Sequence, residues 1–195
     1  MSEMVAYATD SFNRANENPM VGWQDNTVAN RGFQIVSNAA TPDVLNGTCF
    51  ALYVAGSIRW QNDQYVQAKI TVDGTTDNTG LGVIVRGTVG PITANETFYT
   101  VYVNKAATDN IRFIVFFLGT VTPIATRTTT WVDGDTLRLE AISTTFRIYQ
   151  NGTQLGADIT DSTLVAGLPG LFFNDPVTSC LADDWEAGGI PRYLF

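Results

Sequence analysis

Short runs of apolar residues, many of them alternating with polar residues, recur along the chain and are separated by turn signals. The clearest runs span residues 64–73, 80–87, 97–104, 110–119, 136–143 and 145–156. None keeps the 3.6-residue period of an amphipathic helix, and short alternating stretches are typical of strands. Asn151-Gly152 predicts a type I′ hairpin turn, because both central residues of that turn need a positive φ. The sequence therefore predicts an almost entirely β protein.

Alternation within the runs predicts which side chains face the interior. Over 66–72 every second residue is apolar, and over 98–103 Tyr99, Val101 and Val103 are expected to point inward while Tyr102 points outward. The run 110–119 loses its alternation after Arg112, which predicts a strand covered on both faces. A single barrel made of this many short strands would be wide and empty. We therefore expect two antiparallel sheets packed face to face in one domain.

Composition excludes several classes of function. The net charge is −8 with only two lysines, which argues against nucleic acid as a partner, and no apolar stretch approaches the ~20 residues of a membrane span. The chain has no histidine, which excludes serine–histidine and cysteine–histidine catalysis and argues against zinc. Cys49 and Cys180 are predicted to be buried thiols, with one long-range disulfide as the alternative.

The first ten residues lack a basic segment followed by an apolar one, so the sequence predicts no secretion signal. A protein of this kind that acts outside a cell would leave it by lysis or within a larger particle. We therefore expect synthesis in a host cytoplasm.

Four segments together carry a resemblance to a known superfamily. They are "DSFNRANENPMVGW" at 10–23, "GVIVR" at 82–86, the stretch 133–171 and "DDWEAG" at 183–188. The chain resembles the concanavalin A-like lectin/glucanase superfamily, and most of all the laminin-G-like modules of bacteriophage and bacterial surface proteins. The resemblance implies a two-sheet antiparallel jelly-roll sandwich whose first and last strands are neighbours. It implies a domain over 10–188, an N-terminal arm over 1–9 and a C-terminal tail over 189–195.

Many relatives in that superfamily hold a structural calcium ion near the chain ends. By this resemblance, Asp10 and one of Asp183 or Asp184 are the candidate ligands. Calcium takes six to eight oxygen ligands, and the sequence identifies few of them. The alternative is that these aspartates face solvent or cap strand ends.

The "DDWEAGG" segment at 183–189 is also the nearest approach to a catalytic acid cluster. Asp184 and Glu186 have the two-residue spacing of glucanases in the superfamily, but Ala182 stands where those enzymes carry their first glutamate. A glycosidase needs two positioned carboxylates, so we predict no catalysis. Period-2 alternation predicts Asp184 and Glu186 on one face and Asp183 on the other, together with Trp185.

Carbohydrate binding needs aromatic faces and a few polar groups. The candidate glycan-binding residues are Trp60, Arg86, Tyr102, Arg147 and Tyr149. Cross-strand packing or burial in the core is the alternative for each of them.

An apolar C-terminal tail suggests a structural role. The residues expected to dock on a neighbouring chain are Ile190, Tyr193, Leu194 and Phe195. We predict a non-catalytic, homo-oligomeric module on a virion surface, as a capsid decoration or a tail or fibre component. Its partners would be other virion proteins and a cell-surface glycan. The alternatives are a carbohydrate-active enzyme and a free extracellular lectin of a bacterium.

Overall fold

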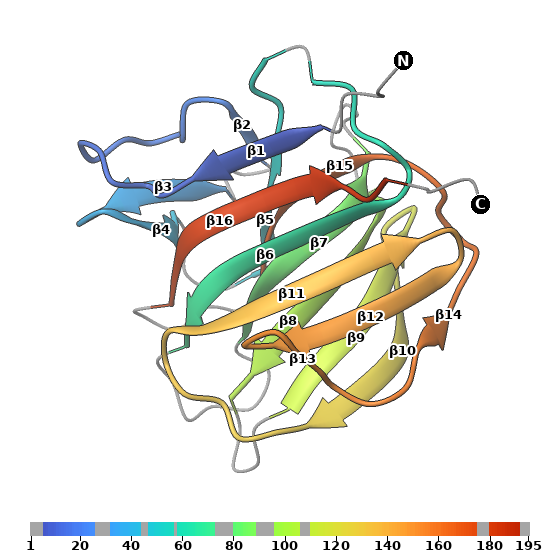
Figure 1. Ribbon diagram of the computed structural model, residues 1–195. Helices are drawn as coiled ribbons and strands as arrows, with labels where there is room; N and C mark the ends of the chain where they lie inside the picture. The colour runs from blue at the N-terminus through green and yellow to red at the C-terminus, as the bar shows by residue number, and fades with distance from the viewer. Residues whose placement is uncertain are drawn as a thin grey trace.

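Two β-sheets packed face to face make up the described part of the protein. The computed structural model describes residues 6–25, 32–43, 47–56, 58–72, 80–88, 96–105, 110–174 and 180–191. None of these residues is helical, and the strands form one nine-stranded and one seven-stranded sheet (Figure 1). The predicted two-sheet antiparallel jelly-roll sandwich is confirmed. In this described part of the chain, no helix is long and apolar enough to cross a membrane.

The nine-stranded sheet has the order β13-β12-β11-β6-β16-β4-β3, with β1 paired to β16 and β14 paired to β12. Its strands are β1 (Tyr7–Asp10), β3 (Phe33–Val36), β4 (Ala39–Pro42), β6 (Gln64–Thr71), β11 (Asp135–Ile142), β12 (Thr145–Gln150), β13 (Thr153–Gln154), β14 (Ile159–Thr160) and β16 (Leu181–Gly189). The seven-stranded sheet has the order β10-β9-β8-β7-β15-β5-β2. Its strands are β2 (Trp23–Asp25), β5 (Cys49–Tyr53), β7 (Gly80–Gly87), β8 (Phe98–Asn104), β9 (Asn110–Phe117), β10 (Thr120–Thr128) and β15 (Leu168–Asn174).

The main core lies between the sheets and follows the predicted alternation. In β8, Tyr99, Val101 and Val103 point into it and are fully buried. In β6 the same is true of every second residue from Val66, because successive side chains of a strand point to opposite faces. The predicted inward faces of both runs are therefore confirmed.

A second apolar cluster covers the outer face of the seven-stranded sheet. Phe98, Phe116 and Phe172 meet there, and the ring centroid of Phe98 lies 4.6 Å from that of Phe116 and 5.8 Å from that of Phe172. All three are buried although they point away from the main core. This confirms the prediction that the strand within 110–119 is covered on both faces.

The first and last strands are neighbours, as the resemblance implied. In Figure 1 the red strand β16 lies between the blue strand β1 and the blue-green strand β6, and β1 pairs antiparallel with β16. The strands extend past the expected domain limits of 10 and 188, because β1 begins at Tyr7 and β16 ends at Gly189. Residues 7–9 of the predicted arm therefore belong to the sandwich.

A β-bulge in β16 overturns one prediction. Ala182 and Trp185 are both buried, so the two residues between them, Asp183 and Asp184, share the outer side. The register between β16 and β6 shifts at this point, and Asp184 has a φ of 47°. A bulge places two residues opposite one and breaks period-2 alternation. Trp185 is in the core as expected, but Asp183 does not point inward with it.

Two local predictions are also confirmed. Asn151 and Gly152 have φ values of 50° and 77°, the positive values that a type I′ turn requires. Cys49 and Cys180 are both buried, and they are not joined by a disulfide.

Candidate functional site

A groove of about 360 Å³ lies on the outer face of the seven-stranded sheet. Its lining residues are Thr48, Tyr102, Asn110, Arg112, Ile114, Phe116, Val121, Pro123, Ala125, Thr126 and Asn174. Strands lie about 4.8 Å apart in a sheet, and β10 stands five places from β5, which Thr48 directly precedes. One groove can touch residues this far apart only if the sheet curves around it. This face is therefore concave, and the groove is large enough for a small ligand.

Tyr102 on β8 packs over the neighbouring strand because that strand carries glycines. A Cβ atom at Gly80 would lie 2.4 Å from Cδ2 of Tyr102, and one at Gly82 would lie 2.6 Å from Cβ of Tyr102. The tyrosine ring occupies this space, with its centroid 5.3 Å from that of Phe172. The two glycines of β7 therefore help to set the depth of the groove.

The groove has a polar end and an apolar end. Tyr102 and Arg112 are paired across β8 and β9, and Nε of Arg112 donates to Oδ1 of Asn110 over 3.2 Å. Burial raises the pKa of Tyr102, while the charge and hydrogen bond of Arg112 oppose the rise, so the phenol is protonated at neutral pH. At the other end, Ile114 and Phe116 supply an apolar surface.

A buried asparagine lies next to the polar end. Asn104 pairs with Asn110 across β8 and β9 and shares the outward face of Tyr102 by alternation. It is fully buried, and neither its amide nitrogen nor its amide oxygen has a hydrogen-bond partner among the described residues. An unpaired buried amide costs free energy, and Asn104 is not among the described residues that line the groove.

The structure describes all five predicted glycan-binding residues. Of these five, only Tyr102 lines this groove. Trp60 is half-buried against the main core, with its ring centroid 6.4 Å from that of Tyr53. Sequence reasoning missed Asn110 and Arg112. The signal for both was the alternation at the start of the run 110–119, where every second residue up to Arg112 is polar.

Arg86, a candidate glycan-binding residue, is a structural residue and does not line the groove. Its side chain is 1% exposed. Its guanidinium donates to the carbonyl oxygens of Leu164 (2.8 Å), Ser143 (2.7 Å) and Asn62 (3.0 Å), and it lies 5.3 Å from the ring centroid of Phe146. A charge can be buried only when it is well hydrogen-bonded. Arg86 therefore joins β7 to three loops and is not available to a ligand.

Arg147 and Tyr149 face outward, but on the nine-stranded sheet and with partners of their own. Nη2 of Arg147 lies 3.0 Å from Oδ2 of Asp158, and the Tyr149 hydroxyl donates to Oε2 of Glu140 over 3.0 Å. Glu140 also accepts two hydrogen bonds from Arg138. These residues form a cross-strand polar network away from the groove.

Asp184 and Glu186 share the outer face, as predicted, and neither lies in the groove. Lys69 forms an ion pair with Asp184 over 2.6 Å. Glu186 accepts hydrogen bonds from Tyr65 (2.5 Å) and Gln67 (3.3 Å). Burial first, and then the hydrogen bond to Glu186, hold the pKa of Tyr65 above its usual value, so its hydroxyl remains a donor. Both carboxylates therefore serve contacts between strands.

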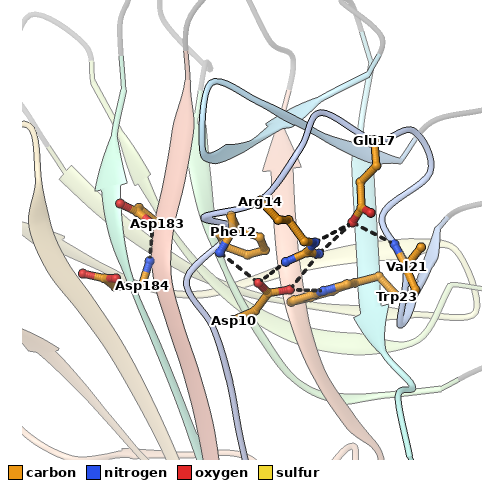
Figure 2. A network of polar contacts seen from close by, with 8 residues as sticks. All are labelled: Asp10, Phe12, Arg14, Glu17, Val21, Trp23, Asp183 and Asp184. Atoms are coloured by element: carbon orange, nitrogen blue, oxygen red, sulfur yellow. Dashed lines mark hydrogen bonds and ion pairs between the residues drawn. The ribbon is translucent and has the colours of Figure 1, made fainter.

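Asp10 is the centre of a network at the chain's first strand (Figure 2). Its carboxylate accepts from Nη1 of Arg14 (2.5 Å), Nε1 of Trp23 (2.9 Å) and the backbone of Phe12 (2.9 Å). Arg14 also pairs with Glu17 over 2.7 Å. The positive charge beside Asp10 is thus the guanidinium of Arg14. It binds the Asp10 carboxylate by charge-assisted hydrogen bonds.

The calcium ligands inferred from the resemblance do not come together. Figure 2 shows the carboxylates of Asp183 and Asp184 pointing away from the Asp10 network. Oδ1 of Asp183 accepts from the backbone of Asp184 over 2.8 Å. Within the described residues, no group of three or more acidic, histidine or cysteine side chains could hold a metal ion. Asp183 and Asp184 instead line a small polar pocket with Ser11, Asn13 and Asn38, and calcium binding stays a prediction.

The C-terminal tail is described only at its start. The backbone N–H of Ile190 donates to the carbonyl oxygen of Asp63 over 2.9 Å, which ties this residue to its own sandwich. Tyr193, Leu194 and Phe195 lie outside the described residues. Docking of the tail on a neighbour stays a prediction.

Asp25 gives the protein a pH dependence of its own. Burial, with a smaller contribution from the charge of Asp43, raises its pKa from 3.8 to about 6, although the N–H of Phe33 opposes the rise. Since the folded pKa exceeds the unfolded one, the folded state holds this proton more tightly. The resulting stability is fully present below pH 3.8 and is lost as the pH rises through about 6.

We therefore expect Asp25→Asn to stabilise the protein at pH 7.5 by about 1 to 2 kcal/mol, allowing for partial exposure, and to have little effect near pH 4. Urea unfolding at both pH values measures this. The control is Asp158→Asn, because the hydrogen bond from Arg147 lowers the pKa of Asp158 and the expected effect has the opposite sign. Equal stabilisation by Asp25→Asn at both pH values would contradict the assignment.

Comparison with solved structures places this architecture among known folds. A carbohydrate binding module, CBM66 from Bacillus subtilis, matches with a TM-score of 0.62 and 21% identity over 88% of this chain and 94% of that one. The CBM2 module of the evolved Dit of Lactobacillus casei BL23 phage J-1 matches with a TM-score of 0.62 and 8% identity over 97% and 98% of the two chains. The fold is concanavalin A-like.

A third concanavalin A-like relative is the exoplasmic/lumenal domain of VIP36, in a form bound to Ca²⁺ and Man3GlcNAc. It has a TM-score of 0.62 and 14% identity over 89% of this chain and 86% of that chain. The concanavalin A-like fold predicted from the sequence is thus confirmed. No known family model matches the sequence, and no curated protein matches it. The laminin-G-like subtype stays a prediction.

Proposed function

We propose that this protein is a non-catalytic carbohydrate-binding module and that it binds a glycan in the groove of the seven-stranded sheet. The observation that carries the proposal is the groove itself. It combines a tyrosine, an arginine and asparagine amides with an apolar surface on a concave sheet. Hydroxyl groups of a sugar can bind the polar groups, and the apolar faces of its rings can cover the apolar end. The shared fold with CBM66 supports this proposal.

Binding without catalysis is favoured by where the carboxylates lie. No acidic side chain is among the described residues that line the groove. Glycoside hydrolysis by the usual route needs two carboxylates on either side of the bond. Asp184 and Glu186 belong to the other sheet, where cross-strand partners hold them.

We also propose that the module works on a virion surface, as an oligomeric component that adheres to a host glycan. The likeness to a module of a phage Dit, which spans nearly all of both chains, supports this location. Electron microscopy of particles labelled with an antibody against this protein tests it, and label found only on free protein would contradict it.

Blocking the groove is expected to abolish glycan binding. Thr126 is exposed on the edge strand β10 and lines the groove, so Thr126→Trp would fill it without disturbing the core. We expect at least about a tenfold loss of affinity on a glycan array followed by calorimetry. The matched control is Thr122→Trp, at an exposed position of the same strand that does not line the groove. Retained binding in Thr126→Trp, or no glycan bound by the wild type, would refute the proposal.

A further inference from the structure

The charged side chain in the described lining of the groove is opposite in sign to the net charge of the protein. The chain has a net charge of −8. Of the described residues that line the groove, Arg112 is the one charged side chain, and none carries a carboxylate. A cleft with low-dielectric walls concentrates the field of such a charge. The described lining of the groove is therefore positive, whereas the protein as a whole is acidic.

The acidic side chains described above lie elsewhere. Asp10 turns toward Trp23, and Asp25 is on β2, at the opposite edge of the groove's sheet from β10. Glu140, Asp184 and Glu186 are on the outer face of the nine-stranded sheet. The two sheets pack back to back through the main core, so these charges are on the far side of the sandwich from the groove. An anion would meet less repulsion at the groove than at that outer face.

The polar groups at this end favour an anionic acceptor. Arg112, the protonated hydroxyl of Tyr102 and the amides of Asn110 and Asn174 are all able to donate hydrogen bonds. The strongest acceptors for the hydroxyl groups of a neutral sugar are carboxylates, and the described lining has none. An arginine instead matches the two oxygens of a carboxylate or a sulfate.

We propose that the groove takes an acidic saccharide and that its carboxylate or sulfate group pairs with Arg112. This inference rests on the proposed function and names its ligand class. The neighbouring Asn110, which accepts from Nε of Arg112, holds the guanidinium in place. Tyr102 lies under the adjoining sugar ring, and the apolar end accommodates the next residue of the glycan.

The test compares matched pairs of ligands on the full chain. Oligogalacturonate is compared with its methyl ester, and dextran sulfate with dextran, by calorimetry. We expect the acidic member of at least one pair to bind at least about tenfold more tightly than its neutral counterpart. A preference for oligogalacturonate over its methyl ester would identify a carboxylate ligand, and a preference for dextran sulfate over dextran would identify a sulfate. The affinity should also fall as sodium chloride is raised from about 50 mM to about 500 mM, because salt screens an exposed ion pair.

Two substitutions connect the preference to the groove. Arg112→Gln is expected to remove the preference for the acidic ligand and most of its salt dependence, while Arg112→Lys retains part of both. Arg147→Gln makes the same charge change on the other sheet and should alter neither. A circular dichroism spectrum checks that each variant is folded.

The outcomes separate this inference from the proposed function. Neutral and acidic ligands bound equally, with binding lost in Thr126→Trp but unchanged in Arg112→Gln, would overturn the acidic ligand and leave the glycan site. An acidic preference that persists in Arg112→Gln would also overturn it. If no saccharide binds to the wild type, both proposals fail.

Discussion

Replacing Arg86 with methionine is expected to lower the free energy of unfolding by about 3 to 5 kcal/mol, a large part of the stability of a domain of this size. Methionine fills much of the same space but cannot donate. The carbonyl oxygens of Asn62, Ser143 and Leu164 would then lose their charge-assisted hydrogen bonds in a buried site. Urea denaturation followed by tryptophan fluorescence measures the change.

The matched control for this prediction is Arg147→Met. Arg147 pairs with Asp158 at the surface, where an ion pair contributes little to stability, so a much smaller change is expected. The folded fraction of Arg86→Met should still bind glycan, because Arg86 does not line the groove. A stable Arg86→Met protein that has lost glycan binding would mean that Arg86 serves the ligand after all.

Replacing Asp10 with alanine is the second substitution with a large expected effect, about 2 to 4 kcal/mol of unfolding free energy. The carboxylate is only 10% exposed, and three donors converge on it from Arg14, Trp23 and Phe12. Its removal leaves the indole N–H of the buried Trp23 without its acceptor and separates Arg14 from β1. Thermal and urea unfolding both report the loss.

Asp184→Ala is the control for Asp10→Ala, because its ion pair with Lys69 is exposed and its removal should change stability little. Treatment of the wild type with EDTA should leave the unfolding midpoint unchanged, since Arg14 already supplies the positive charge beside Asp10. An EDTA-dependent loss of stability that Asp10→Ala abolishes would show that Asp10 binds a metal ion.

Alternation in the sequence was sufficient to predict the inner faces, because the direction of a side chain in a strand depends only on its position in that strand. It failed at Asp183, because the bulge adds a residue on one strand and reverses the alternation after it. Alternation also gave no sign that Arg86 is buried. Arg86 has a φ of 56°, the register between β7 and β15 shifts beside it, and its guanidinium lies over Phe146 of the main core. Neither irregularity follows from the local pattern of residues.

The alternation in the sequence by itself determined that the chain is a two-sheet sandwich and that Tyr102 points outward, and the resemblance to a known superfamily implied that β1 and β16 are neighbours. Only the tertiary structure decided which outward residues meet. Tyr102, Arg112 and Asn174 come from three strands, and they share one groove because of strand order and sheet curvature. Period-2 alternation gives the face of each residue. The pairing of distant strands, which depends on long-range packing, gives its neighbours.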